Sequence, residues 1–242
     1  MTEQPVEELL AAVEARAKQC VACPLAQTRT NVVFGEGNPR SPLVIVGEGP
    51  GEQEDATGRP FVGRAGALLD KALREAGMLR RHVYICNIVK CRACVIENGR
   101  TRNRPPAQDE IQACYPWLDQ QLSLIKPLVI VCLGAPAAST LIHKNFKIMQ
   151  ERGLWFSNRY APAVIAALHP AYILRQAGEA YERAYQSLVD DLTAARERAR
   201  ELRRLQEQLQ PLQPEGDDQL RMFYPPRCPL SPRFRVLCMR YA

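Results

Sequence analysis

Four short apolar runs, separated by helical patterns, constrain the fold of this chain more than any other feature. They occupy residues 42–51, 82–91, 127–135 and 161–172. Each run is brief, continuous and followed by a polar loop, which is typical of central strands buried on both faces of a sheet. Amphipathic patterns of helical period lie between them, notably at 63–79 and 107–125. Strands that alternate with helices predict an α/β fold with a parallel sheet.

The length of 242 residues fits one domain with an appendage better than two independent domains. A first helix is expected at 6–18 and a long final helix at 179–210. Residues 211–242 are rich in proline and break all periodicity, so we expect an extension that is disordered or packs irregularly. The predicted organisation is a domain at 1–210 followed by an extension at 211–242.

Composition limits the location and the partners of the chain. No stretch approaches the roughly 18 uninterrupted apolar residues that a membrane span needs. Residues 1–20 lack the basic and apolar regions of a signal peptide, so we expect a cytoplasmic protein without a membrane partner. The formal net charge of +6 permits an anionic partner. Arginines cluster at 80–81, 91–104 and 195–204, although most charge runs are solvated surfaces.

Nine cysteines are many for a chain with no export signal, and their odd number argues against a disulfide framework. Cys20 and Cys23 form one CxxC pair, and Cys91 and Cys94 form a second. Two such pairs suit a tetrahedral zinc site, but Cys114 offers a different fourth ligand. Four thiolates without histidine suit either zinc or an iron–sulfur cluster, and spacing alone leaves both open.

Polar groups follow the predicted strands at the edge where parallel sheets bind ligands. A glycine-rich loop at 47–55 follows the first strand, Asn87 ends the second and His169 follows the fourth, while Phe61 lies in the tract 56–66. Each has an ordinary structural explanation, such as a tight turn, a turn cap or core packing. Their convergence on successive strand ends nevertheless predicts an active site. The tract lacks the GK[ST] of a P-loop, so nucleotide hydrolysis is not predicted.

Three segments carry a resemblance to a known family. GEGPGEQEDATGRPFVGRAGALLDKAL, YICNIVKCR and HPAYILR resemble the signature segments of family 4 uracil-DNA glycosylases, bacterial and archaeal enzymes that carry a [4Fe–4S] cluster. The similarity runs from about Glu8 to about Thr193, with the segments in the family order. It implies a three-layer α/β/α fold with a central, mainly parallel four-stranded sheet. It also implies hydrolysis of the N-glycosidic bond of uracil in DNA, which initiates base excision repair.

The resemblance further implies the ligands of the cluster, which would be Cys20, Cys23, Cys91 and Cys114. Cys94 would then lie in an arginine-bearing insertion, roughly 93–101, that the family usually lacks. The cluster is expected to order the loops that face DNA and to take no part in cleavage. The arginines of 92–104 are expected to contact the DNA backbone.

The uracil pocket of the family maps onto this chain residue by residue. Phe61 matches the aromatic that stacks on the flipped base, Asn87 the amide that bonds the uracil edge, and His169 the histidine near O2. The loop that lies against the base and the attacking water corresponds to Gly47, Glu48 and Gly49, and Gln53 stands where relatives often carry an acidic residue.

These matches suggest a mechanism. His169 would stabilise the departing uracil anion by a hydrogen bond. Better-known uracil glycosylases have an aspartate where this chain has Gly49, so we expect Glu48 or loop carbonyls to position the water. No lysine stands where it would indicate Schiff-base lyase activity, and a monofunctional enzyme is expected.

Extrusion of the nucleotide from DNA must precede this chemistry. The segment HPAYILR resembles a loop that such enzymes push into the minor groove, with Leu174 as a candidate wedge and Arg175 as a candidate phosphate contact. Core packing is an equal alternative for Leu174. The expected partner is uracil-containing DNA, bound by a monomer.

Other classes of protein remain as alternatives. A nucleic-acid-binding protein with a structural zinc site and no catalysis would account for the two CxxC pairs, but not for the converging Phe61, Asn87 and His169. A glycosylase with another base preference, such as hypoxanthine or mismatched thymine, would differ only in the floor of the pocket. A degenerate scaffold is disfavoured by the intact motifs.

Overall fold

The computed structural model describes residues 4–97 and 99–209, so the extension predicted at 211–242 lies outside the described residues. The elements below belong to a compact unit that runs to Leu205, and the last turn of the final helix continues beyond it. The four strands and the long helices predicted from the sequence are all present, with ends that differ by a few residues.

The main sheet has six strands in the order β1-β3-β2-β6-β8-β7. Their bounds are β1 Glu36–Gly37, β2 Leu43–Gly47, β3 Tyr84–Asn87, β6 Val129–Leu133, β7 Trp155–Phe156 and β8 Ala163–Ala167. The four central strands are the predicted ones, and they pair in parallel. The two-residue strands β1 and β7 add an antiparallel pair at each edge.

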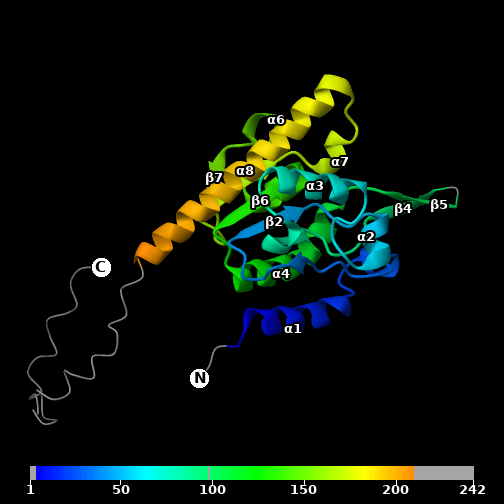
Figure 1. Ribbon diagram of the computed structural model, residues 1–242. Coiled ribbons are helices and arrows are strands. Elements are labelled where there is room, and N and C mark those ends of the chain that lie inside the picture. Colours follow the sequence, from blue (N-terminus) through cyan, green and yellow to red (C-terminus); the bar gives the residue numbers. More distant parts are fainter. Residues whose placement is uncertain (1–3, 98, 210–242) are drawn as a thin grey trace, which may run out of the picture. The chain divides into compact units, whose positions relative to one another are not determined.

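Helices cover both faces of this sheet, as the three-layer prediction requires (Figure 1). Their bounds are α1 Val6–Lys18, α2 Glu52–Thr57, α3 Arg64–Glu75, α4 Gln108–Ile125, α5 Ala135–Leu141, α6 Ile148–Glu151, α7 Pro170–Ile173 and α8 Gly178–Leu209, with short 3-10 turns η1 Pro24–Gln27 and η2 Arg80–His82. Helices α1, α4 and α5 share one hydrophobic core with the sheet, and α3, α7 and α8 share the other.

The central strands are buried on both sides because their side chains alternate between these two cores. In β2, Val44 and Val46 pack with α1 and α4, whereas Leu43 and Ile45 pack with α3 and α8. All five residues of β2 are buried. This explains why the strand reads as a continuous apolar run and not as an alternating pattern.

A separate two-stranded sheet interrupts the connection between β3 and α4. Strands β4 (Cys94–Glu97) and β5 (Arg100–Asn103) form an antiparallel hairpin that projects from the main body (Figure 1). The insertion expected near 93–101 is therefore an ordered hairpin, and its second strand is made entirely of exposed polar residues.

Candidate active site

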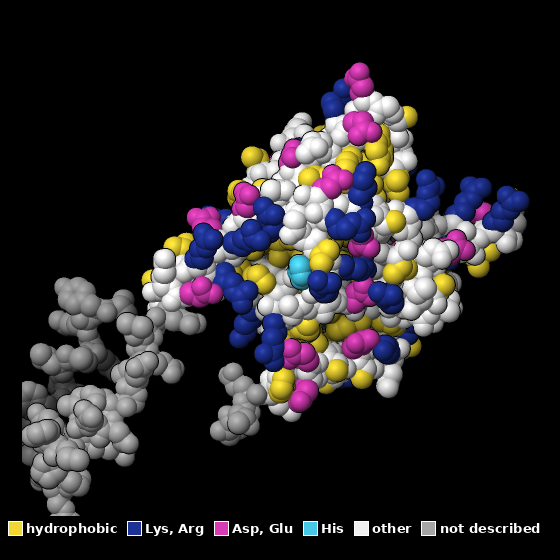
Figure 2. All heavy atoms as spheres, viewed as in Figure 1, with side chains coloured by type: hydrophobic (Ala, Val, Ile, Leu, Met, Phe, Trp, Pro, Cys, Tyr) yellow, Lys and Arg dark blue, Asp and Glu magenta, His cyan; other side chains and the backbone are white. Residues whose placement is uncertain are grey.

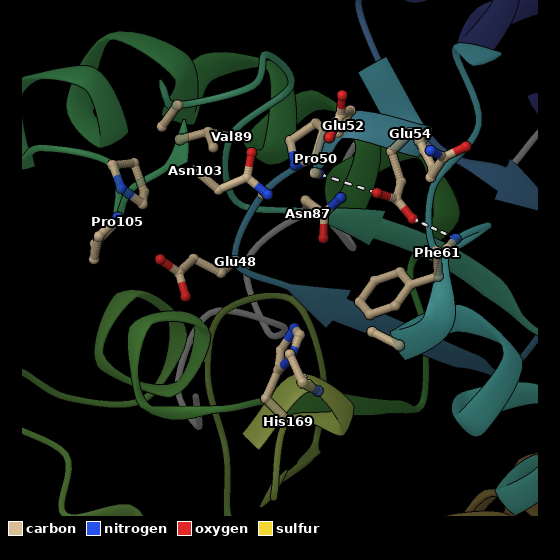
Figure 3. A pocket seen from close by; sticks show the side chains of 18 of the residues that line it. Glu48, Pro50, Glu52, Glu54, Phe61, Asn87, Val89, Asn103, Pro105 and His169 are labelled. Atoms are coloured by element: carbon tan, nitrogen blue, oxygen red, sulfur yellow. Dashed lines mark hydrogen bonds between the residues drawn. The ribbon is translucent and has the colours of Figure 1, made fainter. Parts of the chain in front are cut away.

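A cavity of about 600 Å³ opens at the carboxyl ends of β2, β3 and β8. Its wall includes Glu48 and Gly49 after β2, Asn87 at the end of β3, and His169 after β8. Phe61, Gln53 and Arg175 also line it. In the close view, the side chains of Glu48, Phe61, Asn87 and His169 point into one space (Figure 3). The cavity thus gathers the residues that the sequence analysis had singled out at separate strand ends.

Gly47 stands behind this wall, where no larger residue fits. A Cβ at this position would come within 2.5 Å of both the Asn87 Oδ1 atom and the Phe61 ring. Phe61 itself has a left-handed backbone, with φ of 52°, which is uncommon for a bulky residue. The guanidinium of Arg80 donates to the carbonyl oxygens of Phe61 and Pro60 and so holds this conformation in place.

Asn87 is the last residue of β3 and is only 1 % exposed. Its Oδ1 atom is buried and has no hydrogen-bond partner within the described part of the chain. A buried amide oxygen without a partner is costly, by roughly 1–3 kcal/mol. Such an atom on the wall of a cavity fits a site whose ligand supplies the missing donor.

His169 precedes helix α7, and its Nδ1 atom accepts a hydrogen bond from the backbone N–H of Ala171 at 3.1 Å. In a neutral imidazole the proton must then be on Nε2. Burial, and to a lesser degree the charge of Arg175, lower the pKa of His169 to about 4, with Glu54 opposing them. The side chain is therefore neutral at pH 7 and can donate one hydrogen bond from Nε2. Its ring centroid lies 5.8 Å from that of Phe61.

Glu48 is the carboxylate that reaches into the cavity from the glycine-rich loop (Figure 3). Partial burial raises its pKa, and the nearby Arg175 opposes this effect. The backbone of the loop is fixed by β-like bonds, because Ile88 N–H donates to Gly47 O at 2.9 Å and Val89 N–H donates to Glu48 O at 3.2 Å. These two bonds hold the loop after β2 against the segment that follows Asn87.

Glu54 is a site residue that the sequence analysis missed. Its Oε1 atom accepts hydrogen bonds from the N–H groups of Val62 and Gly63, both at 2.8 Å, and its Oε2 atom accepts from Gly51 N–H at 3.1 Å. One carboxylate therefore joins the glycine-rich loop to the turn that carries Phe61. The spacing of Glu54 three residues after Gly51 is the capping-box signal that could have identified it.

Asn103 at the end of β5 also lines the cavity and was not singled out. Its Oδ1 atom accepts a hydrogen bond of 2.7 Å from Arg92 Nε, so its amide NH₂ remains to face the cavity near Glu48 (Figure 3). Nothing in the sequence marks this residue, because its position depends on the path of the hairpin.

Some residues of the segment HPAYILR line the cavity, and others pack in the hydrophobic core. Arg175 is exposed and lines the cavity. Leu174 directly follows helix α7 and is partly buried. It packs against the hydrophobic core that the sheet shares with α3 and α8. The roles of wedge and phosphate contact stay predictions, and the packing alternative for Leu174 is visible in the structure.

The four cysteines expected to bind a cluster all line one small hollow, which shares no lining residue with the cavity. Arg29 donates to Cys91 Sγ at 3.4 Å, and the backbone N–H of Lys90 donates to Cys114 Sγ at 3.1 Å. Burial raises the pKa of the Cys91 thiol and raises that of Cys114 to about 11. Cys94 does not line the hollow. In residues 4–97 and 99–209, no group of three or more His, Cys, Asp or Glu side chains is arranged to hold a metal ion.

Comparison with known proteins agrees with this architecture. A sequence model of the uracil DNA glycosylase superfamily matches residues 34–193. A type-4 uracil-DNA glycosylase of Thermotoga maritima is 50 % identical over 170 residues, which cover 70 % of this chain and 85 % of the relative. A type-4 uracil-DNA glycosylase of Pyrobaculum aerophilum is 40 % identical over 166 residues, or 66 % of this chain and 81 % of the relative.

A more distant relative is the type-5 uracil-DNA glycosylase of Pyrobaculum aerophilum, 30 % identical over 154 residues that cover 54 % of this chain and 64 % of the relative. None of the helices in the described ranges is long and apolar enough to cross a membrane. The matched residues run from before β2 to within α8 and so include the residues at both ends of the cavity wall, Gly47 and His169. The type-4 relatives are more similar to this chain than the type-5 one, in identity and in the share of the chain that is covered. The chain belongs to the uracil DNA glycosylase superfamily and, within it, to the type-4 uracil-DNA glycosylases.

Proposed function

We propose that the protein is a monofunctional uracil-DNA glycosylase, which flips uracil out of DNA and hydrolyses its N-glycosidic bond to leave an abasic site. The observation that carries this function is the buried, unpartnered Oδ1 atom of Asn87 at the wall of the cavity. We also propose a role for each residue of the site.

Asn87 accounts for selection of the base. Its Oδ1 atom can accept from N3–H of uracil while its amide NH₂ donates to O4. Cytosine presents the reverse pattern at these two positions, so it would leave buried groups unpaired and be rejected strongly. Phe61 closes one side of the pocket, where its ring can stack on the base. Gly47 allows both side chains to take these positions, because a Cβ at residue 47 would collide with them.

His169 accounts for departure of the base. Cleavage builds oxocarbenium character on the sugar and negative charge on uracil. The neutral imidazole donates from Nε2 to the developing charge at O2, and a well-aimed donor of this kind is worth about 3–4 kcal/mol. The bond between His169 Nδ1 and Ala171 N–H fixes both the tautomer and the ring orientation.

Glu48 accounts for the attacking water. Its carboxylate and the carbonyls of the loop at Gly47 and Gly49 can hold a water against C1′ of the sugar, in the absence of an aspartate at Gly49. Gln53, exposed at the start of α2, borders the same space. If replacement of Glu48 by alanine left the single-turnover rate unchanged, the water would be held by other groups.

Binding of DNA brings the base to the cavity. Extrusion of the nucleotide costs a few kcal/mol, which is lower at a mismatch. Arg175 at the mouth of the cavity is suited to a phosphate, and Leu174 beside it to a wedge in the minor groove. We propose that the enzyme works as a monomer in the cytoplasm.

We also propose that Cys20, Cys23, Cys91 and Cys114 hold a [4Fe–4S] cluster. Four thiols around one hollow and two N–H···S bonds to them are the donor set that supports it. The cluster, once bound, supplies structure and no atom to the cleavage. It would fix the segment between Asn87 and Cys91 and the base of the β4–β5 hairpin.

The function is tested with an oligonucleotide that contains one uracil, incubated in EDTA and then treated with alkali. EDTA suppresses magnesium-dependent nucleases and leaves a glycosylase active. We expect strand cleavage only after alkali, opposite both guanine and adenine, and a much lower but measurable rate in Asn87→Ala. Folded protein that leaves uracil intact would overturn the proposal, and activity on hypoxanthine or mismatched thymine would then identify a glycosylase of other base preference.

A further inference from the structure

The β4–β5 hairpin starts and ends at the rim of the cavity. Ala93, just before β4, and Asn103, the last residue of β5, both line the cavity wall. The two legs are joined at this point, because Arg104 N–H donates to Ala93 O at 3.0 Å and Arg92 Nε donates to Asn103 Oδ1 at 2.7 Å. The direction of the hairpin is therefore set by the same residues that form the wall.

An ion pair anchors the base of the hairpin to the main body. The guanidinium of Arg104 donates to both carboxylate oxygens of Glu110 on α4, at 2.7 and 2.6 Å, and Glu110 is 3 % exposed. A bidentate pair of this kind fixes geometry as well as adding energy. Beyond the anchor, residues 95–97 and 99–103 are all exposed. A hairpin that buries none of its own side chains adds little to the stability of the fold, which points to a role in binding.

The exposed part of the hairpin is positively charged. Its exposed residues carry two arginines, Arg100 and Arg102, and one glutamate, Glu97. Arg100 and Arg102 share one face of β5, opposite Glu97 and Val95 of β4. The ion pair between Arg102 and Glu97 spans 3.8 Å with both side chains more than half exposed, so it neutralises little. Lys and Arg side chains stand out along the projecting hairpin (Figure 2).

We propose that the β4–β5 hairpin is a DNA-binding element in which Arg100 and Arg102 contact the phosphate backbone beside the flipped nucleotide. This inference rests on the proposed function. Arg100 precedes Asn103 by three residues, so it lies about 10 Å farther out along the strand, at roughly 3.3 Å per residue. Phosphates of one strand follow each other every 3.4 Å or so along the helix axis, so Arg100 reaches about three nucleotides from the cavity. The forked guanidinium groups suit phosphate oxygens.

The test measures DNA binding by Arg100→Ala/Arg102→Ala as a function of salt. The probe is a duplex whose uracil nucleotide carries 2′-fluorine, which suppresses cleavage and leaves the backbone charge unchanged. Loss of two phosphate contacts should reduce the slope of log Kd against log salt by about 1.8. Neither arginine lines the cavity, so any loss of uracil excision at limiting enzyme should follow the loss of DNA binding.

Two matched variants control the experiment. Arg198→Ala/Arg200→Ala removes the same charge from α8, where Arg200 borders a hollow with Ser41 and Leu43 at the other end of β2, and should leave the slope unchanged. Glu97→Gln removes the negative charge from the hairpin and should tighten binding. An unchanged slope in the Arg100/Arg102 variant would overturn the inference even if the wild type excises uracil. A wild type that does not excise uracil would instead overturn the proposed function.

Discussion

The Nζ atom of Lys90 donates a 2.7 Å hydrogen bond to the main-chain carbonyl oxygen of Asn87. Lys90 is 1 % exposed and lines the hollow of the four cysteines, whereas Asn87 faces the cavity. The segment from Asn87 to Cys91 therefore joins the two sites, and Lys90 fixes the main chain that carries the recognition amide. Substitutions at Lys90 should therefore alter the position of Asn87 in the base pocket, although Lys90 itself does not line the cavity.

Lys90→Met keeps a long apolar side chain but removes this donor. The lost bond is worth about 1–3 kcal/mol, so kcat/KM for uracil excision should fall roughly 5- to 150-fold. If Lys90 acts through Asn87, the same substitution should change little in an Asn87→Ala background. Equal losses in both backgrounds would contradict a positioning role. Visible absorbance of each variant checks that the cysteine site is intact.

Glu54→Ala should disturb both stability and activity, because one carboxylate satisfies three backbone N–H groups. We expect the free energy of unfolding to fall by about 2–4 kcal/mol, together with a lower kcat/KM as Phe61 loses its support. Glu52→Ala is the matched control, since this neighbour is 70 % exposed and has only a 3.8 Å contact with Arg92. Urea unfolding of both variants is the measurement, and similar values for the two would contradict the role of Glu54.

His169→Asn removes the Nε2 donor but keeps a side chain that can cap helix α7. The single-turnover rate should fall about 100- to 1,000-fold, with little change in stability at pH 7. The wild-type rate should show no histidine step between about pH 5 and 8, because the pKa of His169 is about 4. A step near pH 6.5 in a rate-against-pH profile would contradict a neutral donor.

The same lowered pKa predicts how stability depends on pH. Burial and Arg175 lower the folded-state pKa of His169 to about 4, with Glu54 opposing, whereas an unfolded histidine titrates near 6.5. Between these values the unfolded state binds the extra proton, so the free energy of unfolding falls as the pH drops from about 6.5 to about 4. This loss should be smaller in His169→Asn. Urea unfolding at both ends of the window measures the difference.

Cys20, Cys23, Cys91 and Cys114 should each be required for the cluster, whereas Cys94, outside the hollow, should not. Serine variants of the four should lose a brown absorbance near about 400 nm together with their iron and sulfide, and Cys94→Ser should keep all three. A colourless wild type that contains zinc would contradict the cluster and favour the zinc alternative.

The central sheet could be predicted because its strands are buried on both faces and therefore read as apolar runs. The edge strands could not, since Glu36–Gly37 and Trp155–Phe156 are too short for any periodicity. Strand β5, Arg100–Asn103, carries no apolar residue, so no apolar pattern marks its pairing with β4. The insertion was visible in the sequence, but its form was not.

The candidate site was predicted in part for a similar reason. Asn87 and His169 stand directly at strand ends, so topology alone brings them together. Glu54 and Asn103 reach the cavity from a helix and a hairpin, and their positions depend on loop paths. The left-handed backbone of Phe61 likewise has no local signal, because it is imposed by Arg80 and by its close approach to Gly66.

The two-residue strands β1 and β7 leave the main sheet with short edges, one of which carries Gly37 at a φ of 114°. A sheet grows between molecules when an exposed edge offers a long row of unpaired N–H and C=O groups. Here such a row is only two residues long on either side. Pairing of the main sheet with strands of another molecule is thereby discouraged, even though four of the most apolar segments of the chain lie side by side within it.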